Sequence, residues 1–178
     1  MRECGLPAYS LIGLECCGWG GTESSSAGEY VVEDAGHVFF RHPEATGLQN
    51  GESFGSGGGK SRKAVGHEYD VRVRTLARMT RSIPPGASIP EEPAGIATLA
   101  FGRRPGKEGA LDYFTNPAQP VEGVVAEMIY WERPQGGRVF NAGAIGAGWS
   151  LGADPKLSRL MRNVLHHFGV ASPERRSQ

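Results

Sequence analysis

The 178-residue chain lacks a surplus of either charge, because 19 Lys and Arg side chains balance 19 Asp and Glu side chains. A balanced chain has no overall field to attract nucleic acid or an anionic membrane, so neither partner is expected. The chain also lacks any run of eighteen apolar residues, and its first 13 residues (MRECGLPAYSLIG) have no long apolar core. We therefore expect neither a membrane span nor a signal peptide, and predict a soluble protein.

Cysteine is scarce, and its spacing fits no disulfide framework and no zinc site. Cys4, Cys16 and Cys17 are odd in number, and adjacent cysteines bridge each other only with strain. His37 and His42 supply no zinc spacing either. A reduced protein located in the cytoplasm is the expectation.

Glycine, by contrast, is abundant: its 27 residues are about twice the usual share. This excess favours turns and loops and argues against an all-helical protein. The length suits one domain, which we place at residues 1–170, followed by a flexible polar tail at 171–178.

The clearest structural signal is a continuous stretch near the C-terminus. Residues 126–132 are apolar and aromatic over the length of a strand, and residues 133–137 (RPQGG) supply a turn. Residues 138–142 then form the return strand of a hairpin.

A capped helix is predicted next. Asp154 suits the N-cap, Pro155 the first helical position and Gly169 the position just past the end. Apolar residues recur between them at three- and four-residue spacing, with Arg159, Arg162 and His166 on the side facing water. The apolar stripe consists of Leu157, Leu160, Met161, Val164, Leu165 and Phe168.

The remainder of the chain reads as short strands and long loops. Strands are predicted at 9–15, 29–33, 64–73 and 96–101, with a further short apolar run at 37–41 and an ambiguous segment at 76–79. Connectors without regular structure are expected at 82–93, 102–109 and 111–124. One well-defined helix is too few to cover both faces of an open sheet, so the pattern indicates part of an α/β architecture.

Two glycine-rich segments resemble nucleotide-binding loops but lack the required spacing. In 55–61 (GSGGGKS) the first glycine of a phosphate loop is replaced by Phe54, and a strand rather than a helix is predicted to follow. In 143–148 (GAIGAG) the order of glycines does not fit a dinucleotide site. We expect a surface loop in the first case and close packing of backbone in the second, where contact with a ligand stays an alternative.

Cys16 and Cys17 precede Gly18 and suggest a nucleophile elbow, but the preceding glycine is missing. A nucleophilic cysteine also needs a positioned base, and no spacing supplies one. We therefore do not expect catalysis by either thiol, although a distant histidine could approach in the fold.

The segment with the most candidate chemistry is 67–70, His-Glu-Tyr-Asp. On a strand, His67 and Tyr69 would face one side, and Glu68 and Asp70 the other. Two carboxylates on one face could hold a metal or raise each other's pKa for acid–base work. The alternative is a solvated strand face, or ion pairs with nearby arginines.

Four motifs in order resemble the C-terminal part of the N,N-dimethylformamidase large (beta) subunit family, over roughly residues 8–170. They are TGLQNGE at 46–52, GHEYD at 66–70, GGRVFNAG at 136–143 and RNVLHHF at 162–168. The region 96–124 departs from or lengthens the family's pattern.

The resemblance implies a layered sheet like that of class I glutamine amidotransferases. It also implies hydrolysis of the C–N bond of a small-molecule amide at an iron held by two tyrosines and a glutamate. Those ligands belong upstream of the region this chain resembles, so no iron ligand is assigned here. The one residue carried over is Glu68, as an acidic group near the metal pocket that acts as a base or an orienter.

Three hypotheses follow. The first is the C-terminal domain of an amide hydrolase whose metal site needs an upstream part. The second is a non-catalytic binding or interaction module that keeps the fold. The third is a subunit that needs a partner chain to complete its sheet, and an exposed sheet edge would favour homo- or hetero-oligomers.

Overall fold

A computed structural model describes residues 6–19, 28–56, 63–103, 110–119, 121 and 123–170. Its main sheet has five antiparallel strands in the order β3-β2-β5-β6-β7, and β1 and β4 form a separate two-stranded ribbon. The strands are β1 (Glu15–Trp19), β2 (Glu29–Val32), β3 (Ser53–Phe54), β4 (Glu68–Val71), β5 (Ile96–Arg103), β6 (Val124–Glu132) and β7 (Arg138–Asn141). The helices are α1 (Tyr9–Ile12), α2 (Val38–Arg41), α3 (Val73–Met79), α4 (Ala147–Ser150) and α5 (Pro155–His167).

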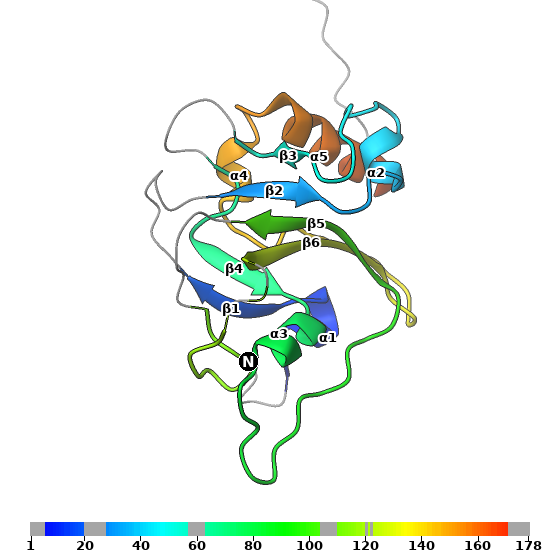
Figure 1. The fold of residues 1–178 in the computed structure, drawn as a ribbon. Helices are drawn as coiled ribbons and strands as arrows, with labels where there is room; N and C mark the ends of the chain where they lie inside the picture. The colour runs from blue at the N-terminus through cyan, green and yellow to red at the C-terminus, as the bar shows by residue number, and fades with distance from the viewer. Residues whose placement is uncertain are drawn as a thin grey trace, which may run out of the picture.

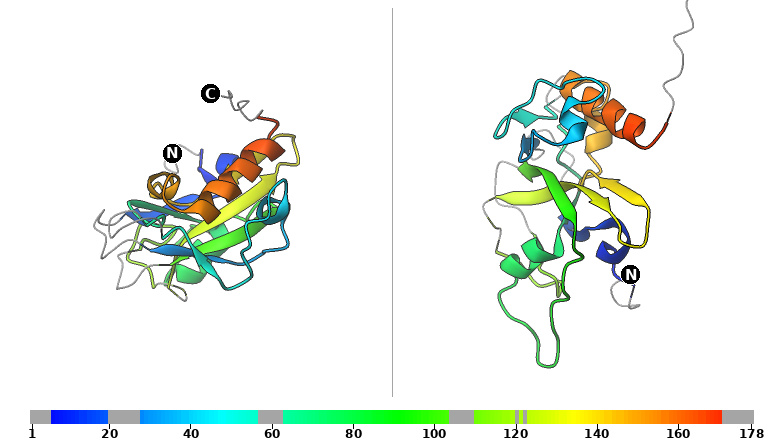
Figure 2. Two further views of the ribbon diagram at one scale, coloured as in Figure 1. Left: turned by 90° about the horizontal axis from the view of Figure 1, so that it is seen from above. Right: turned by 90° about the vertical axis from the view of Figure 1, so that its right-hand side faces the viewer.

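The helices and the β1–β4 ribbon lie at two opposite ends of the molecule, with the main sheet between them. Helices α2, α4 and α5 lie at one end, and β1, β4, α1 and α3 lie at the other (Figure 1). Helix α5 crosses over the strands when the molecule is seen from above (Figure 2). The main core joins Leu157 and Leu160 of α5 to Tyr30 of β2 and Met128 of β6, and it extends to Tyr69 of β4.

The predicted hairpin and C-terminal helix are confirmed. β6 and β7 pair over Ile129–Glu132, and the turn closes with a hydrogen bond from Arg133 N to Gly137 O. Asp154 Oδ1 accepts hydrogen bonds from the first-turn amides of α5, at Lys156 and Leu157.

The apolar stripe of α5 is only partly buried. Leu157, Leu160 and Val164 pack in the core, whereas Leu165 and Phe168 are exposed. Asn163 is fully buried instead, because its side-chain amide donates to Phe39 O and Glu44 O. Apolar spacing alone did not reveal this polar contact.

The predicted strand at 9–15 is wrong. Residues 9–12 form α1, which ends at Gly13 with a φ of 78°, and the strand begins only at Glu15. Glu15 Oε1 accepts a hydrogen bond from Ala8 N and thereby ties the residue before the helix to the start of β1.

Three other segments also differ from the prediction. The apolar run at 37–41 contains α2, whose first turn is capped by His37. Of 64–73 only Glu68–Val71 is a strand, and α3 follows it, so the ambiguous segment 76–79 is helical. Residues 102–103 extend β5, while 104–109 lie outside the described residues.

The remaining predicted strands and connectors agree with the structure where it describes them. β2 and β5 match the predicted strands at 29–33 and 96–101, and 82–93 contains no helix or strand. The described part of 111–123 is also irregular, apart from one isolated bridge between Leu111 and Pro117. The predicted tail at 171–178 and most of the glycine-rich segment 55–61 lie outside the described residues.

The architecture is therefore a mixture of helices and open antiparallel sheets, which is compatible with the expected α/β class. Within the described part of the chain, no helix has the length and hydropathy needed to cross a bilayer.

Candidate functional site

The β1–β4 ribbon brings Cys16 beside two carboxylates, Glu68 and Asp70, that lie far from it in the sequence. Cys16 lies directly opposite Asp70 in the antiparallel register, and the pairing shifts between Cys16 and Gly18. Residues opposite each other on two strands share a face, as do residues two apart on one strand. Cys16, Glu68 and Asp70 therefore lie on one face, and their ligand atoms all lie within 4.8 Å of one another.

The two adjacent cysteines face opposite sides of β1. Cys17 lies in the main core, whereas Cys16 is only half-buried. Successive side chains of a strand point to opposite faces, so Cys16, which pairs with Asp70, is the cysteine beside the carboxylates.

The two alternative interpretations of the carboxylate pair, a solvated strand face and ion pairs with arginines, do not fit the described residues. Glu68 and Asp70 are half-buried rather than solvated. Among the described residues, no lysine or arginine forms an ion pair with either of them. Two negative groups therefore share a partly desolvated face without a basic counterion in the described part of the chain.

Burial raises the pKa of Asp70 to about 6, with a further upward contribution from the neighbouring charge of Glu68. The hydrogen bond from the thiol of Cys16 opposes this rise. A carboxyl group in this range exchanges a proton readily near neutral pH, which is the property a general acid or base needs.

Both thiols have pKa values above the ordinary one. Burial and the nearby charges of Asp70 and Glu68 raise the pKa of Cys16 to about 11. Cys17 is buried on the core side, and burial raises its pKa further still. Because the thiolate is the reactive form, both side chains act at neutral pH as protonated groups.

His67 does not join the cluster. It precedes β4 with a φ of 73°, is exposed, and its ring lies 5.9 Å from that of Trp149 in α4. The predicted alternation places Tyr69 in the core and Glu68 and Asp70 on the other face, but His67 lies outside the strand and does not follow it.

The glycine-rich segment 143–148 supports this ribbon. Gly143 O accepts a hydrogen bond from Asp70 N, and a Cβ atom at Gly143 would lie 2.2 Å from Glu127 O. A Cβ atom at Gly146 would lie 2.8 Å from Ala64 O. The predicted close packing of backbone is therefore confirmed, and it fixes the strand that carries Asp70.

The described part of the other glycine-rich segment, 55–61, is held by hydrogen bonds to α5. Gly55 N and Ser56 N donate to Asp154 Oδ2, at the N-terminus of α5. The described residues that follow, 63–71, contain strand β4 and no helix, so they do not provide the helix N-terminus of a phosphate loop.

The donor set of the ribbon is suited to a metal ion but differs from the iron site implied by the resemblance. Cys16, Glu68 and Asp70 offer one sulfur and two carboxylate groups, whereas the implied site has two phenolates and one carboxylate. Tyr30 OH is committed to Ala142 O, Tyr130 OH donates to Glu132, and Tyr69 faces the core. The cluster contains no tyrosine, so it does not fit the tyrosine–glutamate iron site.

One member of the cluster, Cys16, was not predicted as a partner of the carboxylates. Its position depends on the pairing of β1 with β4, two strands far apart in the sequence, and this pairing has no local sequence signal. Glu68 and Asp70 were found because their spacing matches the period of a strand.

Fold and site together define a mixed α/β protein with a half-buried carboxylate pair beside a protonated thiol. A family model described as N,N-dimethylformamidase beta subunit-like, C-terminal, matches residues 2–160, and the chain belongs to this family. The match ends within α5, so the RNVLHHF motif at 162–168 lies beyond it. A comparison with curated proteins found no match.

The family is related to dimethylformamidase, an amide hydrolase, and the match suggests no activity more specific than amide hydrolysis. Its description as subunit-like makes assembly with other chains plausible, and its relation to dimethylformamidase makes use of a metal possible.

Proposed function

We propose that this chain is the C-terminal domain of an amide hydrolase that cleaves the C–N bond of small N-substituted amides. The observation that carries the proposal is the pairing of Glu68 and Asp70 on one half-buried face, in a chain of the dimethylformamidase-like family. The proposed domain is 1–170, with 171–178 as a polar tail, and the proposed setting is the cytoplasm, where Cys16 and Cys17 stay free thiols.

Asp70 is the proposed proton carrier. Above its pKa of about 6 it is a carboxylate and can accept a proton from the attacking water. The resulting acid returns that proton to the nitrogen of the leaving amine. Glu68 keeps the pKa of Asp70 high through its charge, and we assign it the role of a base or an orienter.

Iron, where the enzyme uses it, is proposed to be held by residues outside this chain, since the Cys16–Glu68–Asp70 cluster contains no tyrosine. We likewise propose that the two sheets belong to a larger layered sheet of the class I glutamine amidotransferase kind. A further part of the enzyme, in the same chain or a partner, would supply the missing layers.

The test is release of dimethylamine from N,N-dimethylformamide by the chain purified together with its co-expressed companion subunits. Asp70→Asn is expected to lower kcat/KM by about 10²-fold or more, because it removes the proton carrier. Glu68→Gln is expected to shift the acidic limb of the pH profile to lower pH. Glu44→Gln, which alters an exposed carboxylate on the far side of the sheet, is the matched control.

Full activity in both the Asp70 and Glu68 variants would overturn the assignment of the site. Absence of amide hydrolysis in the wild-type preparation, with iron supplied, would overturn the proposed activity.

A further inference from the structure

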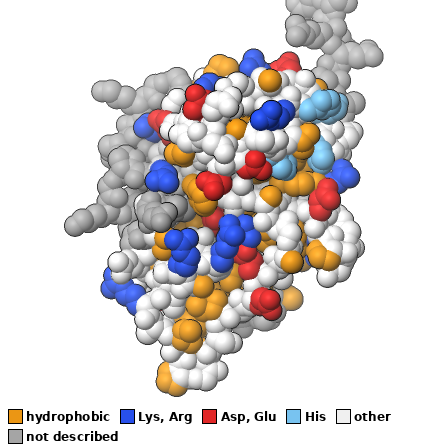
Figure 3. Space-filling model, turned by 45° about the vertical axis from the view of Figure 1, so that its right-hand side comes forward, with side chains coloured by type: hydrophobic (Ala, Val, Ile, Leu, Met, Phe, Trp, Pro, Cys, Tyr) orange, Lys and Arg blue, Asp and Glu red, His pale blue; other side chains and the backbone are white. Residues whose placement is uncertain are grey.

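Four of the five histidines gather where α2 meets α5, away from the β1–β4 ribbon: His37, His42, His166 and His167. The rings of His42 and His166 lie 5.5 Å apart, and those of His37 and His167 each pack beside Phe39 and Tyr130. Histidine side chains gather near apolar ones on this face of the molecule (Figure 3). None of the four belongs to a three-ligand metal group among the described residues, so the proton is the ligand to consider.

His37 holds the start of α2 through a nitrogen that must carry no proton. Its Nδ1 accepts a hydrogen bond from Phe39 N at 3.3 Å, and this contact caps the first turn. An imidazolium has no acceptor nitrogen, so protonation of Nδ1 removes the cap. It also places a positive charge at the positive end of the helix dipole.

Segment 37–46 is joined to α5 by a group that does not titrate. Asn163 of α5 donates its amide hydrogens to Phe39 O and Glu44 O, both at 2.7 Å, and accepts a hydrogen bond from Glu44 N. Ion pairs of Glu44 with Arg159 and Arg162 add contacts to the same helix. The His37 cap is therefore a local contact at the start of α2, and Asn163 still holds the segment when that cap is lost.

The surroundings of His37 favour its neutral form. Burial lowers the pKa of His37, and the neighbouring His167 on α5 lowers it further, whereas Asp34 in the turn before α2 acts in the opposite direction. Arg41, on the same helix, is turned to Ala35 O.

The groups that face His37 from the sheet and from α5 form a hydrogen-bonded chain. Tyr130 OH on β6 donates to Glu132, at 2.6 Å, and lies 3.0 Å from His167 Nε2. With its hydrogen given to Glu132, the hydroxyl oxygen is the acceptor in the contact with His167 Nε2. Arg138 on β7 lies 3.7 Å from Glu132 and donates to His167 O.

We propose that His37 is an acid-sensitive latch, in which protonation of Nδ1 removes the cap of α2 and opens its first turn while Asn163 keeps the segment on α5. The device is independent of amide hydrolysis and operates at the opposite end of the molecule from the carboxylate pair.

The direction of the response follows from the lowered pKa of His37. Between the ordinary histidine value of 6.5 and the lower folded value, the unfolded chain binds more protons than the folded one. The stability that the cap contributes is therefore fully present above pH 6.5, and it is lost as pH falls from there through the lower folded pKa of His37.

The test is hydrogen exchange at the amides of Phe39, Phe40 and His42, followed by NMR between pH 7.5 and pH 5, with rates corrected for the intrinsic effect of pH. Wild-type protein is expected to lose at least tenfold of its protection at these amides on acidification. His37→Asn keeps a capping side chain but cannot titrate, and it is expected to abolish the loss. Asn163→Ala is expected to lower protection equally at both pH values.

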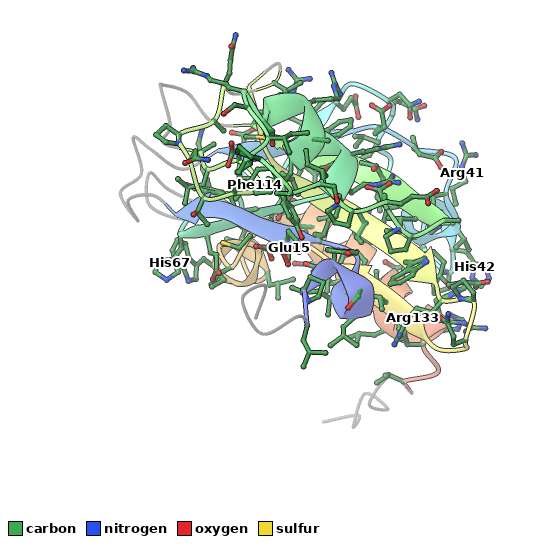
Figure 4. All side chains as sticks on the ribbon, turned by 90° about the horizontal axis from the view of Figure 1, so that it is seen from below. Glu15, Arg41, His42, His67, Phe114 and Arg133 are labelled. Atoms are coloured by element: carbon green, nitrogen blue, oxygen red, sulfur yellow. The ribbon has the colours of Figure 1, made fainter. Side chains whose placement is uncertain are left out.

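His67→Asn is the control, because this histidine lies at the opposite side of the molecule from His42 and Arg41, and asparagine tolerates its positive φ (Figure 4). It should leave the acid response unchanged. An acid response that persists in His37→Asn would overturn the proposal, as would protection in the wild type that is the same at both pH values.

Discussion

The β1–β4 ribbon and the α2–α5 junction both place polar groups in partly or fully buried positions, but they treat them differently. At the junction, Asn163 is fully buried and both its oxygen and its nitrogen are hydrogen-bonded to backbone. In the ribbon, Asp70 and Glu68 lie side by side without an ion pair in the described residues. The first arrangement stabilises the fold, whereas the second raises the pKa of Asp70 at a cost in stability.

The two regions show two different uses of buried polar groups, one that stabilises the fold and one that suits proton exchange. A buried polar group that is fully satisfied holds elements in place, and its removal costs stability. A pair of like charges that is retained despite desolvation is typical of sites that exchange protons. Four substitutions test whether the two regions behave in these opposite ways.

The largest effect is expected at the junction. Asn163→Ala leaves Phe39 O, Glu44 O and Glu44 N without their partner, at about 1–3 kcal/mol for each group that stays buried. We expect a loss of about 5 kcal/mol in the free energy of unfolding, measured by urea denaturation. Leu165→Ala, at an exposed position on the same helix, is the control and should change stability little.

Gly143→Ala tests the backbone that supports the ribbon. Its φ is 70°, and the new Cβ would lie 2.2 Å from Glu127 O, so strand β6 or the glycine-rich segment must move. We expect a loss of about 4 kcal/mol from overpacking and backbone strain together. Gly148→Ala meets no atom within 4 Å and lies in α4, so a stability that is equal or slightly higher is expected there.

Asp70→Asn should raise the free energy of unfolding, whereas the two preceding substitutions should lower it. The raised pKa of Asp70, about 6 against an ordinary 3.8, means that the folded state binds more protons between these values, so its stability falls as pH rises through them. Removing the charge is expected to stabilise the protein by about 2–3 kcal/mol at pH 7 and by nothing below pH 4. Thermal unfolding across this pH range measures it, and a variant less stable than wild type at pH 7 would contradict the comparison.

The smallest effect is expected at the surface of α5. Arg162 donates to Glu44 at 3.3 Å, but both side chains are exposed and Arg159 binds the same carboxylate oxygen. Arg162→Ala is expected to change the free energy of unfolding by less than about 1 kcal/mol. A larger loss, measured by urea denaturation at low and high salt, would show that charge pairs at this end also stabilise the fold.

The parts of the fold that sequence predicted are those with local rules. Asp154, Pro155 and the apolar spacing identify α5, and the glycines of the 133–137 turn identify the hairpin. The segment 9–15 was misassigned because its apolar run suits a strand, while a contact from Glu15 to Ala8 N favours a short helix. α2 was missed because a histidine is an uncommon cap.

The candidate site was likewise predictable only where a local sequence rule applied. The spacing of Glu68 and Asp70 predicts their shared face, but the partner Cys16 depends on a strand pairing that no local pattern encodes. Asn163 was overlooked for a related reason. A single polar residue on an apolar stripe shows its role only when the backbone groups it binds are in place.

The two oxygens of Asp154 have a consequence for how the molecule opens. Oδ1 accepts from the first amides of α5, while Oδ2 accepts from Gly55 N and Ser56 N, which follow β3 nearly 100 residues earlier. One carboxylate thus belongs to both segments, and neither can fray without disturbing the other. The start of the last helix and the end of β3 therefore form one cooperative unit, joined by a single side chain rather than by a continuous stretch of chain.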